Sequence, residues 1–183
     1  PEYLLEDLYD PEFEIDAEAK AMRAVSAFQA ARIRGGKSQP RLLVLLGKVG
    51  RGKSLAASLL ACQKMAQGEG AVFVGAPDYC DEMRDREASP SLRKRVRVTS
   101  MLVLDELGDE FLDQSGRNVY ELVQLMKSRF ETMRPLIMTG NITRAEFERR
   151  YGDRIVSRIL QVGAIVECGG PDRRAKMRKE ANR

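Results

Sequence analysis

An eight-residue motif at positions 47–54, GKVGRGKS, constrains the fold of this chain more than any other part of its sequence. It has two glycines with four residues between them, followed by Lys53 and Ser54. In a phosphate loop of this pattern, backbone N–H groups surround an anion, the lysine reaches the β- and γ-phosphates, and the serine hydroxyl binds Mg²⁺. We therefore predict that the chain binds ATP and Mg²⁺. The predicted nucleotide-binding residues are Gly47, Lys48, Val49, Gly50, Arg51, Gly52, Lys53, Ser54 and Leu55.

The segments on both sides of the motif support this prediction. Residues 41–46 are apolar, as in a buried parallel strand, and residues 54–62 are rich in alanine and leucine, as in a helix. The N-terminus of such a helix attracts phosphate through its unpaired N–H groups and its dipole. A dinucleotide-binding loop is disfavoured because Leu55 stands where the third glycine of that fingerprint would fall. An ordinary glycine-rich turn does not account for the lysine and serine.

The composition is that of a globular protein with one domain. The chain has 183 residues, of which 43% are hydrophobic and 32% charged, and no apolar run approaches the length of a membrane span. Three cysteines and no histidine support neither a zinc site nor a disulfide framework, and they predict a reducing, cytoplasmic location. The lack of histidine also excludes Ser-His and Cys-His catalysis, which leaves carboxylates and metal-bound water.

Apolar segments alternate with helical patterns along the chain, so we predict an α/β fold with a five-stranded parallel sheet and helices on both faces. Ligands of such sheets bind beyond the carboxyl ends of the strands. We expect strands at 41–46, 71–75, 100–104, 135–139 and 164–167, and helices at 17–34, 54–62, 116–134, from 143 and at 153–160. Residues 77–98 are polar and basic and are expected to form a helix followed by a loop.

The two ends of the chain differ in charge. Residues 1–16 are acidic and are expected to be an extended arm or a remnant of a partner-binding region, whereas residues 17–183 form the ATPase domain. A frayed end is the alternative for the arm. The chain starts at Pro1 without an initiator methionine, so we expect that residues are missing before it. The net charge of +4 is compatible with nucleic-acid binding, and the basic segment within 77–98 is a candidate contact to a nucleic-acid backbone, although a solvated surface is the simpler explanation.

Polar residues follow two of the expected strands at the edge where a ligand would bind. Apolar residues 101–104 precede Asp105 and Glu106, which is the Walker B pattern. We predict that Asp105 holds Mg²⁺ together with Ser54, and that Glu106 orients or deprotonates a water molecule that attacks the γ-phosphate. Asn141 follows the fourth strand and is predicted to contact that water or the γ-phosphate, the role called sensor 1. A helix-capping carboxylate pair and a plain turn asparagine are the structural alternatives.

Phosphoryl transfer needs positive charge beyond Lys53 and Mg²⁺, and an arginine from a neighbouring subunit is a common source. Arg154 and Arg158 lie four residues apart in an expected helix and would project from one face. We predict that Arg158 is the arginine finger and that Arg154 has a structural or interface role. Two solvated arginines are the alternative.

Taken together, these motifs resemble the AAA+ domain of the DnaC/IstB-type proteins, which are bacterial and phage replicative-helicase loaders and transposition helper ATPases. The resemblance covers about residues 13–176, and the last of its segments is similar to the family's sensor 2 region. The matching segments are GKVGRGKS at 47–54, LVLDELG at 102–108, SRF at 128–130, PLIMTGN at 135–141, YGDRIVSRI at 151–159 and GPDRRAK at 170–176.

The resemblance implies a three-layer AAA+ fold with a reduced or absent helical lid, a trans arginine finger at Arg158, and sensor 2 at Arg174, with Arg173 adjacent. It also implies ATP-driven homo-oligomeric assembly on single-stranded DNA and the loading of a DnaB-type replicative helicase. The alternative within the family is an IstB-type transposition helper that acts on duplex DNA, and the core motifs do not separate the two. A small-molecule kinase is disfavoured because Glu106 suits hydrolysis and no acceptor pocket is evident, and a nucleotide-gated adaptor ranks low because every catalytic position is filled.

Overall fold

The computed structural model describes residues 18–33, 40–84, 90–170 and 172. Five parallel strands form one sheet in the order β2-β3-β4-β1-β5, which confirms the predicted sheet. In the sheet, β4 lies between β1 and β3. Strand β2 lies between the two nucleotide motifs in the sequence but at the edge of the sheet. The strands are β1 (Leu42–Leu46), β2 (Ala71–Gly75), β3 (Met101–Leu107), β4 (Leu136–Gly140) and β5 (Gly163–Glu167).

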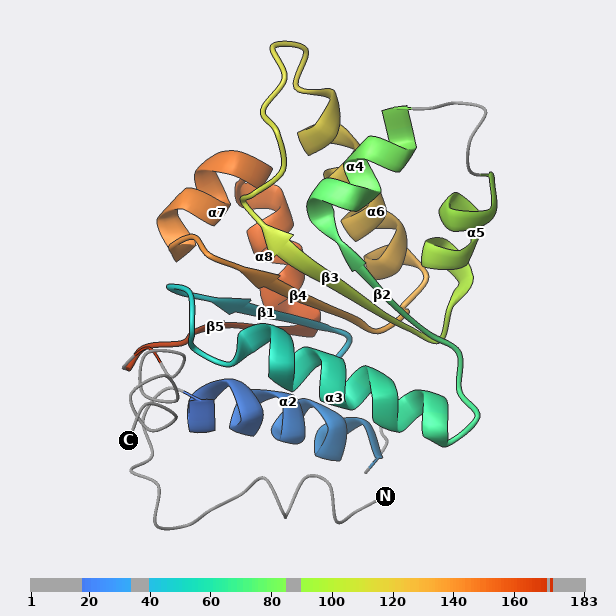
Figure 1. Ribbon diagram of the computed structural model, residues 1–183, viewed down its shortest axis with the longest axis vertical. Helices are drawn as coiled ribbons and strands as arrows, with labels where there is room; N and C mark the ends of the chain where they lie inside the picture. The colour runs from blue at the N-terminus through green and yellow to red at the C-terminus, as the bar shows by residue number, and fades with distance from the viewer. Residues whose placement is uncertain (1–17, 34–39, 85–89, 171, 173–183) are drawn as a thin grey trace, which may run out of the picture.

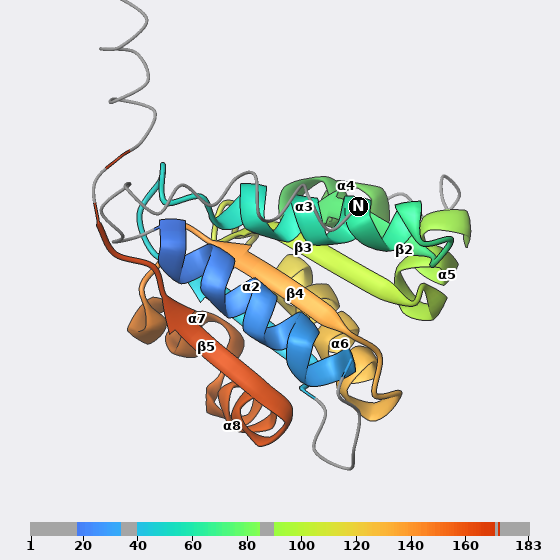
Figure 2. The same cartoon turned by 90° about the horizontal axis from the view of Figure 1, so that it is seen from below.

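Helices cover both faces of the sheet, so the described chain has three layers (Figures 1 and 2). Alternate residues of β1 face opposite layers, as the two-residue period of a strand requires: Leu42 and Val44 pack on one side, and Leu43 and Leu45 on the other. One layer holds α2 (Glu18–Ile33) and α3 (Lys53–Ala66); the other holds α4 (Ala76–Arg84), α5 (Pro90–Val98), α6 (Arg117–Glu131), α7 (Arg144–Tyr151) and α8 (Asp153–Val162).

The basic segment between β2 and β3 differs from its prediction. Instead of one helix and a loop, two short helices, α4 and α5, lie on either side of residues 85–89, which are outside the described part. The carbonyl of Met83 near the end of α4 accepts hydrogen bonds from Arg93 (3.0 Å) and Arg117 (3.1 Å). Some of the arginines therefore stabilise the fold rather than face solvent.

Arg129 of α6 fixes the end of α5 from inside the protein. Its side chain is fully buried and donates to the carbonyl oxygens of Thr99 (2.8 Å), Val96 (3.3 Å) and Pro135. Burial lowers the pKa of the Arg129 guanidinium to about 10, with the nearby charges of Arg134 and Arg32 adding to the effect. The two terminal nitrogens of this buried cation donate to carbonyls, and these bonds hold α5, the start of β3 and the start of β4 together.

The remaining elements agree with the sequence within a few residues. Thr143 and Glu146 form the predicted capping box at the start of α7, and Gly152 separates α7 from α8. Among the described residues, no helix has both the length and the apolar character that crossing a membrane requires. Residues 1–16, expected to be an acidic arm, lie outside the described residues.

Candidate nucleotide-binding site

Lys53 lies at the centre of the predicted phosphate loop. Its ammonium group donates to the carbonyls of Gly47 (2.7 Å) and Lys48 (2.8 Å) and to Oδ1 of Asn141 (3.0 Å), and only 5% of the residue is exposed. These contacts join the loop after β1 to the end of β4, the neighbouring strand. The structure thus brings together two residues that are 88 positions apart in the chain and that the motifs predicted to share a site.

The backbone of the loop is shaped for close approach. Gly52 has a φ of 73°, a left-handed conformation that favours glycine, and it precedes the first residue of α3 without a side-chain cap. The first N–H groups of α3 are therefore not capped by a side chain, and they are the groups that would bind an anion at this end of the helix. At Gly47, a Cβ atom would lie 2.3 Å from the carbonyl oxygen of Cys168, so the chain after β5 passes directly over the loop.

Asp105 and Ser54 meet as the Walker B prediction requires. Ser54 Oγ donates to Asp105 Oδ1 at 2.8 Å, and the Asp105 residue is 7% exposed. Thr139 on β4 also donates from its Oγ1 to Asp105 Oδ1. Thr139 lies within the matching segment 135–141, but no role is predicted for it from the sequence; only the sheet order shows that it lies beside Asp105.

Glu106 is directed differently from its neighbour by an irregularity in β3. The register between β3 and β4 shifts between Leu104 and Leu107, and Glu106 adopts a φ of 61°, which is uncommon for a residue with a side chain. Asp105 is therefore buried while Glu106 is exposed. Burial, followed by the charges of Asp105, Asp109 and Asp78, raises the pKa of Glu106 above its usual value. A raised pKa favours a carboxylate that takes a proton from water.

Asn141 has contacts on both sides of its amide group. Oδ1 accepts from Lys53, and Nδ2 donates to Asp109 Oδ2 at 3.2 Å. The side chain is exposed at the end of β4, between the phosphate loop and Asp105 in the sheet. This position suits the predicted contact to a γ-phosphate or to an attacking water, and that role stays a prediction.

The donor set fits the predicted magnesium ion. Mg²⁺ prefers oxygen ligands and is usually bound by one or two carboxylates together with phosphates and water. Ser54 Oγ and Asp105 Oδ1 supply a hydroxyl and a carboxylate oxygen next to Lys53. Within the described residues there is no group of three or more His, Cys, Asp and Glu side chains that would hold a metal without a phosphate.

The predicted arginines are placed away from this group of residues. Arg158 is half-buried on α8, and its guanidinium carbon lies 5.5 Å from the centre of the Phe130 ring on α6. Arg154 is exposed one turn earlier on the same helix. Because α8 and α3 lie in opposite layers, Arg158 packs on the other side of the sheet from α3, an arrangement that suits a trans finger (Figure 1). The finger role remains a prediction.

The predicted sensor 2 arginines, Arg173 and Arg174, lie outside the described residues. Asp172, which directly precedes them, is described, and a Cβ atom on Gly50 would lie 2.0 Å from its Oδ1. The segment that leads to the predicted sensor 2 position therefore reaches the phosphate loop.

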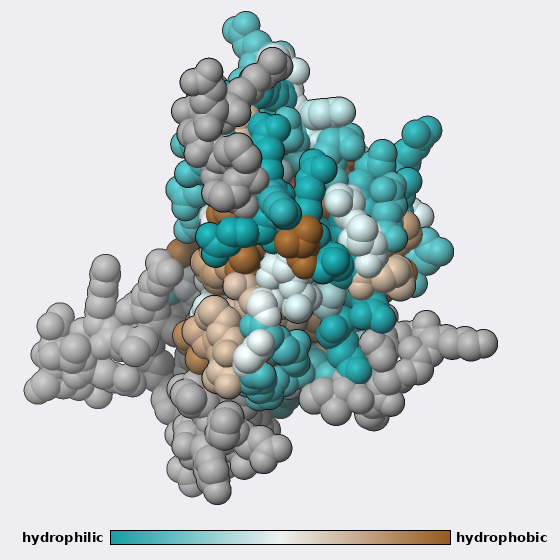
Figure 3. Space-filling model, turned by 90° about the vertical axis from the view of Figure 1, so that its right-hand side faces the viewer, coloured by the Kyte–Doolittle hydropathy of each residue, from teal (hydrophilic) through white to brown (hydrophobic). Residues whose placement is uncertain are grey.

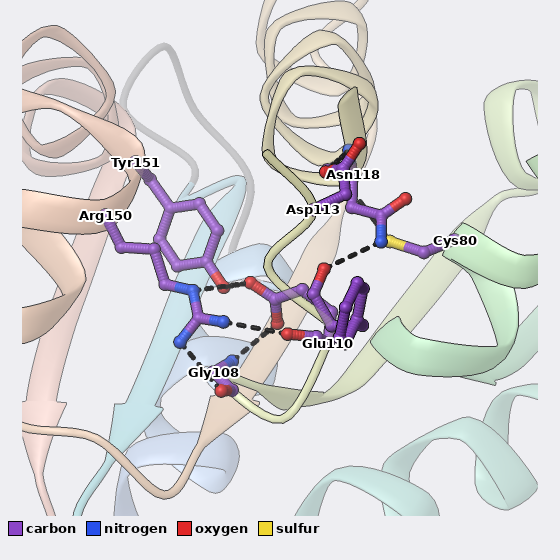
Figure 4. A network of polar contacts seen from close by, with 8 residues as sticks. Cys80, Gly108, Glu110, Asp113, Asn118, Arg150 and Tyr151 are labelled. Atoms are coloured by element: carbon purple, nitrogen blue, oxygen red, sulfur yellow. Dashed lines mark hydrogen bonds and ion pairs between the residues drawn. The ribbon is translucent and has the colours of Figure 1, made fainter. Parts of the chain in front are cut away.

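A polar network that the sequence analysis did not predict anchors the loop after the Walker B strand (Figure 4). Glu110 is 2% exposed; its carboxylate accepts from the hydroxyl of Tyr151 (2.6 Å) and from the N–H of Gly108 (2.8 Å), and it pairs with Arg150 Nε (2.8 Å). Arg150 also donates to the carbonyls of Gly108 (2.7 Å) and Glu110 (2.9 Å). No motif marks Glu110, so the sequence alone gave no signal for it.

Comparison with known proteins gives a family match over nearly the whole chain. The model of the IstB-like ATP binding protein family matches residues 5–181. A protein of insertion sequence IS5376 from Geobacillus stearothermophilus, named as ATP-binding, is 26% identical over 145 residues, which are 75% of this chain and 57% of that protein.

Two solved structures share the fold. AMPPCP-bound DnaA from Aquifex aeolicus has a TM-score of 0.69 at 20% identity and covers 99% of this chain, whereas this chain covers 55% of it. The DnaC helicase loader has a TM-score of 0.63 at 22% identity, with 80% of this chain and 89% of that chain covered. The chain spans little more than half the length of the insertion-sequence protein and of DnaA. At these identities the two structures establish the AAA+ fold, as predicted.

Proposed function

The chain belongs to the IstB-like ATP binding protein family, and from this membership and the geometry of the site we propose that it hydrolyses ATP in an assembly on DNA. The observation that carries the proposal is the convergence of Lys53, Ser54, Asp105 and Asn141 at one edge of the sheet. They come from three separate motifs, since Lys53 and Ser54 share the phosphate loop, and their contacts support the roles that the motifs predict. The match to a family of ATP-binding proteins agrees with the predicted ATPase activity.

Each side chain of the site has its own role in the proposed hydrolysis. Lys53 neutralises charge on the β- and γ-phosphates, and Asn141 positions the γ-phosphate or the water. Ser54 and Asp105 would hold Mg²⁺, which would supply positive charge beside the phosphates. Glu106 is the carboxylate available to orient or deprotonate the attacking water, and its raised pKa suits that task.

A second copy of the chain would complete the site. Arg158 of α8 lies against Phe130 of α6, in the layer opposite α3, and Arg154 is exposed on the same helix. Contact between the exposed nucleotide edge of one copy and α8 of the next would bring Arg158 to the γ-phosphate. Hydrolysis would then require assembly.

DNA contact is supported by the charge on α5. Lys94, Arg95 and Arg97 are exposed, whereas Arg93 is engaged with Met83. The side of the molecule on which α5 lies is largely hydrophilic (Figure 3). Three exposed cations on one short helix suit contacts to a phosphate backbone, which fix position without reading sequence.

The groove between α5 and α6, about 430 Å³ in volume, is less suited to a polyanion. Arg97, Lys127 and Tyr120 line it, but so do Glu121 and Glu131. The negative charges of carboxylates repel a phosphate group that lies beside them. We therefore assign DNA contact to the exposed cations of α5, of which Arg97 also borders this groove, rather than to the groove itself.

Two DNA-related roles fit the proposal. The family match and the insertion-sequence relative favour a transposition helper that acts on duplex DNA. Loading of a DnaB-type helicase on single-stranded DNA, the first prediction from the sequence, is supported by the fold that the chain shares with the DnaC helicase loader. A fold shared at 22% identity weighs less than a family match over residues 5–181.

A comparison of DNA substrates tests the proposal and separates the roles. We expect duplex DNA to increase the rate of ATP hydrolysis, which is measured as phosphate release. A single strand of the same sequence should increase this rate less. A clear preference for the single strand would favour the helicase loader instead. Absence of ATP hydrolysis with every DNA at high protein concentration would contradict the ATPase itself.

A further inference from the structure

Asp109 occupies an unexpected place beside the predicted sensor. It follows the Walker B strand by two residues, its side chain is exposed, and its Oδ2 accepts from Nδ2 of Asn141 at 3.2 Å. The other end of the same amide accepts from Lys53 at 3.0 Å. Both hydrogen-bonding ends of Asn141 are therefore engaged by the protein, and the end that would donate to a phosphate oxygen is held by a carboxylate.

We propose that Asp109 restrains the Asn141 amide and competes with the γ-phosphate of ATP for its Nδ2 donor. This inference rests on the proposed nucleotide site and adds a residue that regulates it. Nδ2 has two N–H donors, and an amide N–H donates equally well to a carboxylate or a phosphate oxygen. In this proposal the γ-phosphate takes the N–H that Asp109 holds, so ATP displaces Asp109 when it engages Asn141. ADP lacks the γ-phosphate and leaves the pair in place. Asp109 thus lowers the affinity for ATP relative to ADP.

The position of Asp109 is fixed by its own backbone N–H, which donates to the Glu106 carbonyl at 3.1 Å, and by its neighbours. Gly108 donates its N–H to the Glu110 carboxylate and accepts from Arg150, so the residues on both sides of Asp109 are tied to α7 (Figure 4). Burial and the charge of Glu110 raise the pKa of Tyr151 well above its usual value, which keeps its hydroxyl protonated as a donor to Glu110. Glu110 is in this account a positioning residue that acts through Asp109.

The loop also carries an exposed apolar pair. Phe111 and Leu112 are 69% and 59% exposed, yet Asn118 Nδ2 donates to the Phe111 carbonyl at 2.8 Å and Arg84 lies 5.6 Å from the Phe111 ring centre. The pair follows Asp109 by two and three residues. Release of Asp109 by ATP would therefore act on a surface segment as well as on the site.

The test is a double-mutant cycle read as a ratio of nucleotide affinities. Titration calorimetry with Mg²⁺ measures the dissociation constants of ADP and of a non-hydrolysable ATP analogue. We expect Asp109→Ala to raise the affinity for the ATP analogue relative to ADP by about threefold to tenfold, the range for the net contribution of one typical hydrogen bond. In an Asn141→Ala background, Asp109→Ala should leave the ratio unchanged.

A charge control separates competition from general repulsion. Asp78→Ala removes an exposed carboxylate whose charge also acts on Glu106 and that has no described hydrogen bond to Asn141. It should raise the affinities for both nucleotides alike. An equal rise for both nucleotides in Asp109→Ala, no rise, or the same change of ratio without Asn141 would overturn the inference. Failure of the unaltered protein to bind either nucleotide would instead overturn the proposed function.

The role of Glu110 is tested in the same assay. Glu110→Gln weakens the contacts of the Glu110 side chain with Arg150, Tyr151 and Gly108 without a change in side-chain volume. It should raise the affinity for the ATP analogue relative to ADP, as Asp109→Ala does. Tyr151→Phe should raise this ratio less. Thermal melting confirms that the variants are folded. A lower melting temperature with an unchanged ratio in Glu110→Gln would show a merely structural residue and remove Glu110 from this account.

Discussion

Lys53 makes more of the contacts that define the site than any other residue. A comparison of its loss with the loss of Glu106 separates nucleotide binding from hydrolysis. We expect Lys53→Ala to weaken ATP binding by roughly tenfold or more, since a hydrogen bond to a charged group contributes about 1.5–3 kcal/mol. Glu106→Gln should bind ATP with nearly unchanged affinity and hydrolyse it about 10²–10⁴-fold more slowly. Glutamine keeps the shape of glutamate, but its amide cannot take a proton from water. Fluorescent-nucleotide titration and phosphate release measure the two effects.

The contrast between the two variants is the informative result. A Lys53→Ala protein that binds ATP as tightly as the unaltered protein would show that the phosphates bind elsewhere. Full turnover by Glu106→Gln would show that another group activates the water. Asp78→Ala, which removes a neighbouring carboxylate outside the assigned machinery, controls for a general effect of charge.

Most residues of the site were predictable because each has a local signature. The lysine and serine after a glycine pair, the carboxylates after an apolar strand and the asparagine after the next strand are all visible in the sequence. Thr139, Asp109 and Glu110 were not, because their partners lie about 30 to 40 residues away along the chain and depend on strand order and loop path. Arg174 stays a prediction.

Helix α5 is the element for which the structure changes the argument most. Its charge run was predicted to be a loop, yet it forms a helix whose end is held by Arg129 and whose outer residues remain exposed. The period of apolar residues is a weak signal in nine residues with so many charges. The strands were easier to predict, because β1, β3 and β4 are buried on both faces and have nearly continuous apolar sequences.

We predict that the exposed cations of α5 carry DNA binding. The triple change Lys94→Glu, Arg95→Glu and Arg97→Glu should weaken binding by at least about tenfold at low salt. It should also make the dependence of log affinity on log salt shallower, by roughly one for each phosphate that the variant no longer neutralises. Fluorescence anisotropy with labelled DNA at several salt concentrations measures both quantities.

A matched change on the other face is the control for this prediction. Lys20→Glu on α2 alters an exposed charge in the layer opposite α5 and should leave the salt dependence unchanged. Equal loss of binding in the control and the triple variant would indicate a general effect of net charge. In that case α5 would not be the contact surface.

At the scale of the whole molecule, the layers determine why one chain does not suffice. The phosphate loop leads into α3 on one face of the sheet, and Arg158 lies on α8 on the other face, against Phe130. We therefore propose that a finger on α8 acts on the site of a neighbouring copy. The sequence predicted the three layers from alternating strands and helices, but only the structure shows that Arg158 packs on α6 while Arg154 is exposed.

Mixing two inactive variants is the most direct measurement of the central claim, that a neighbour's arginine completes this ATP site. Arg158→Ala has an intact nucleotide site and no finger, whereas Glu106→Gln has a finger and an inactive site. Each alone should hydrolyse ATP at least about 10²-fold more slowly than the unaltered protein. An equimolar mixture should regain turnover that rises with protein concentration, and full activity of Arg158→Ala alone, or a mixture as inactive as its components, would contradict the claim.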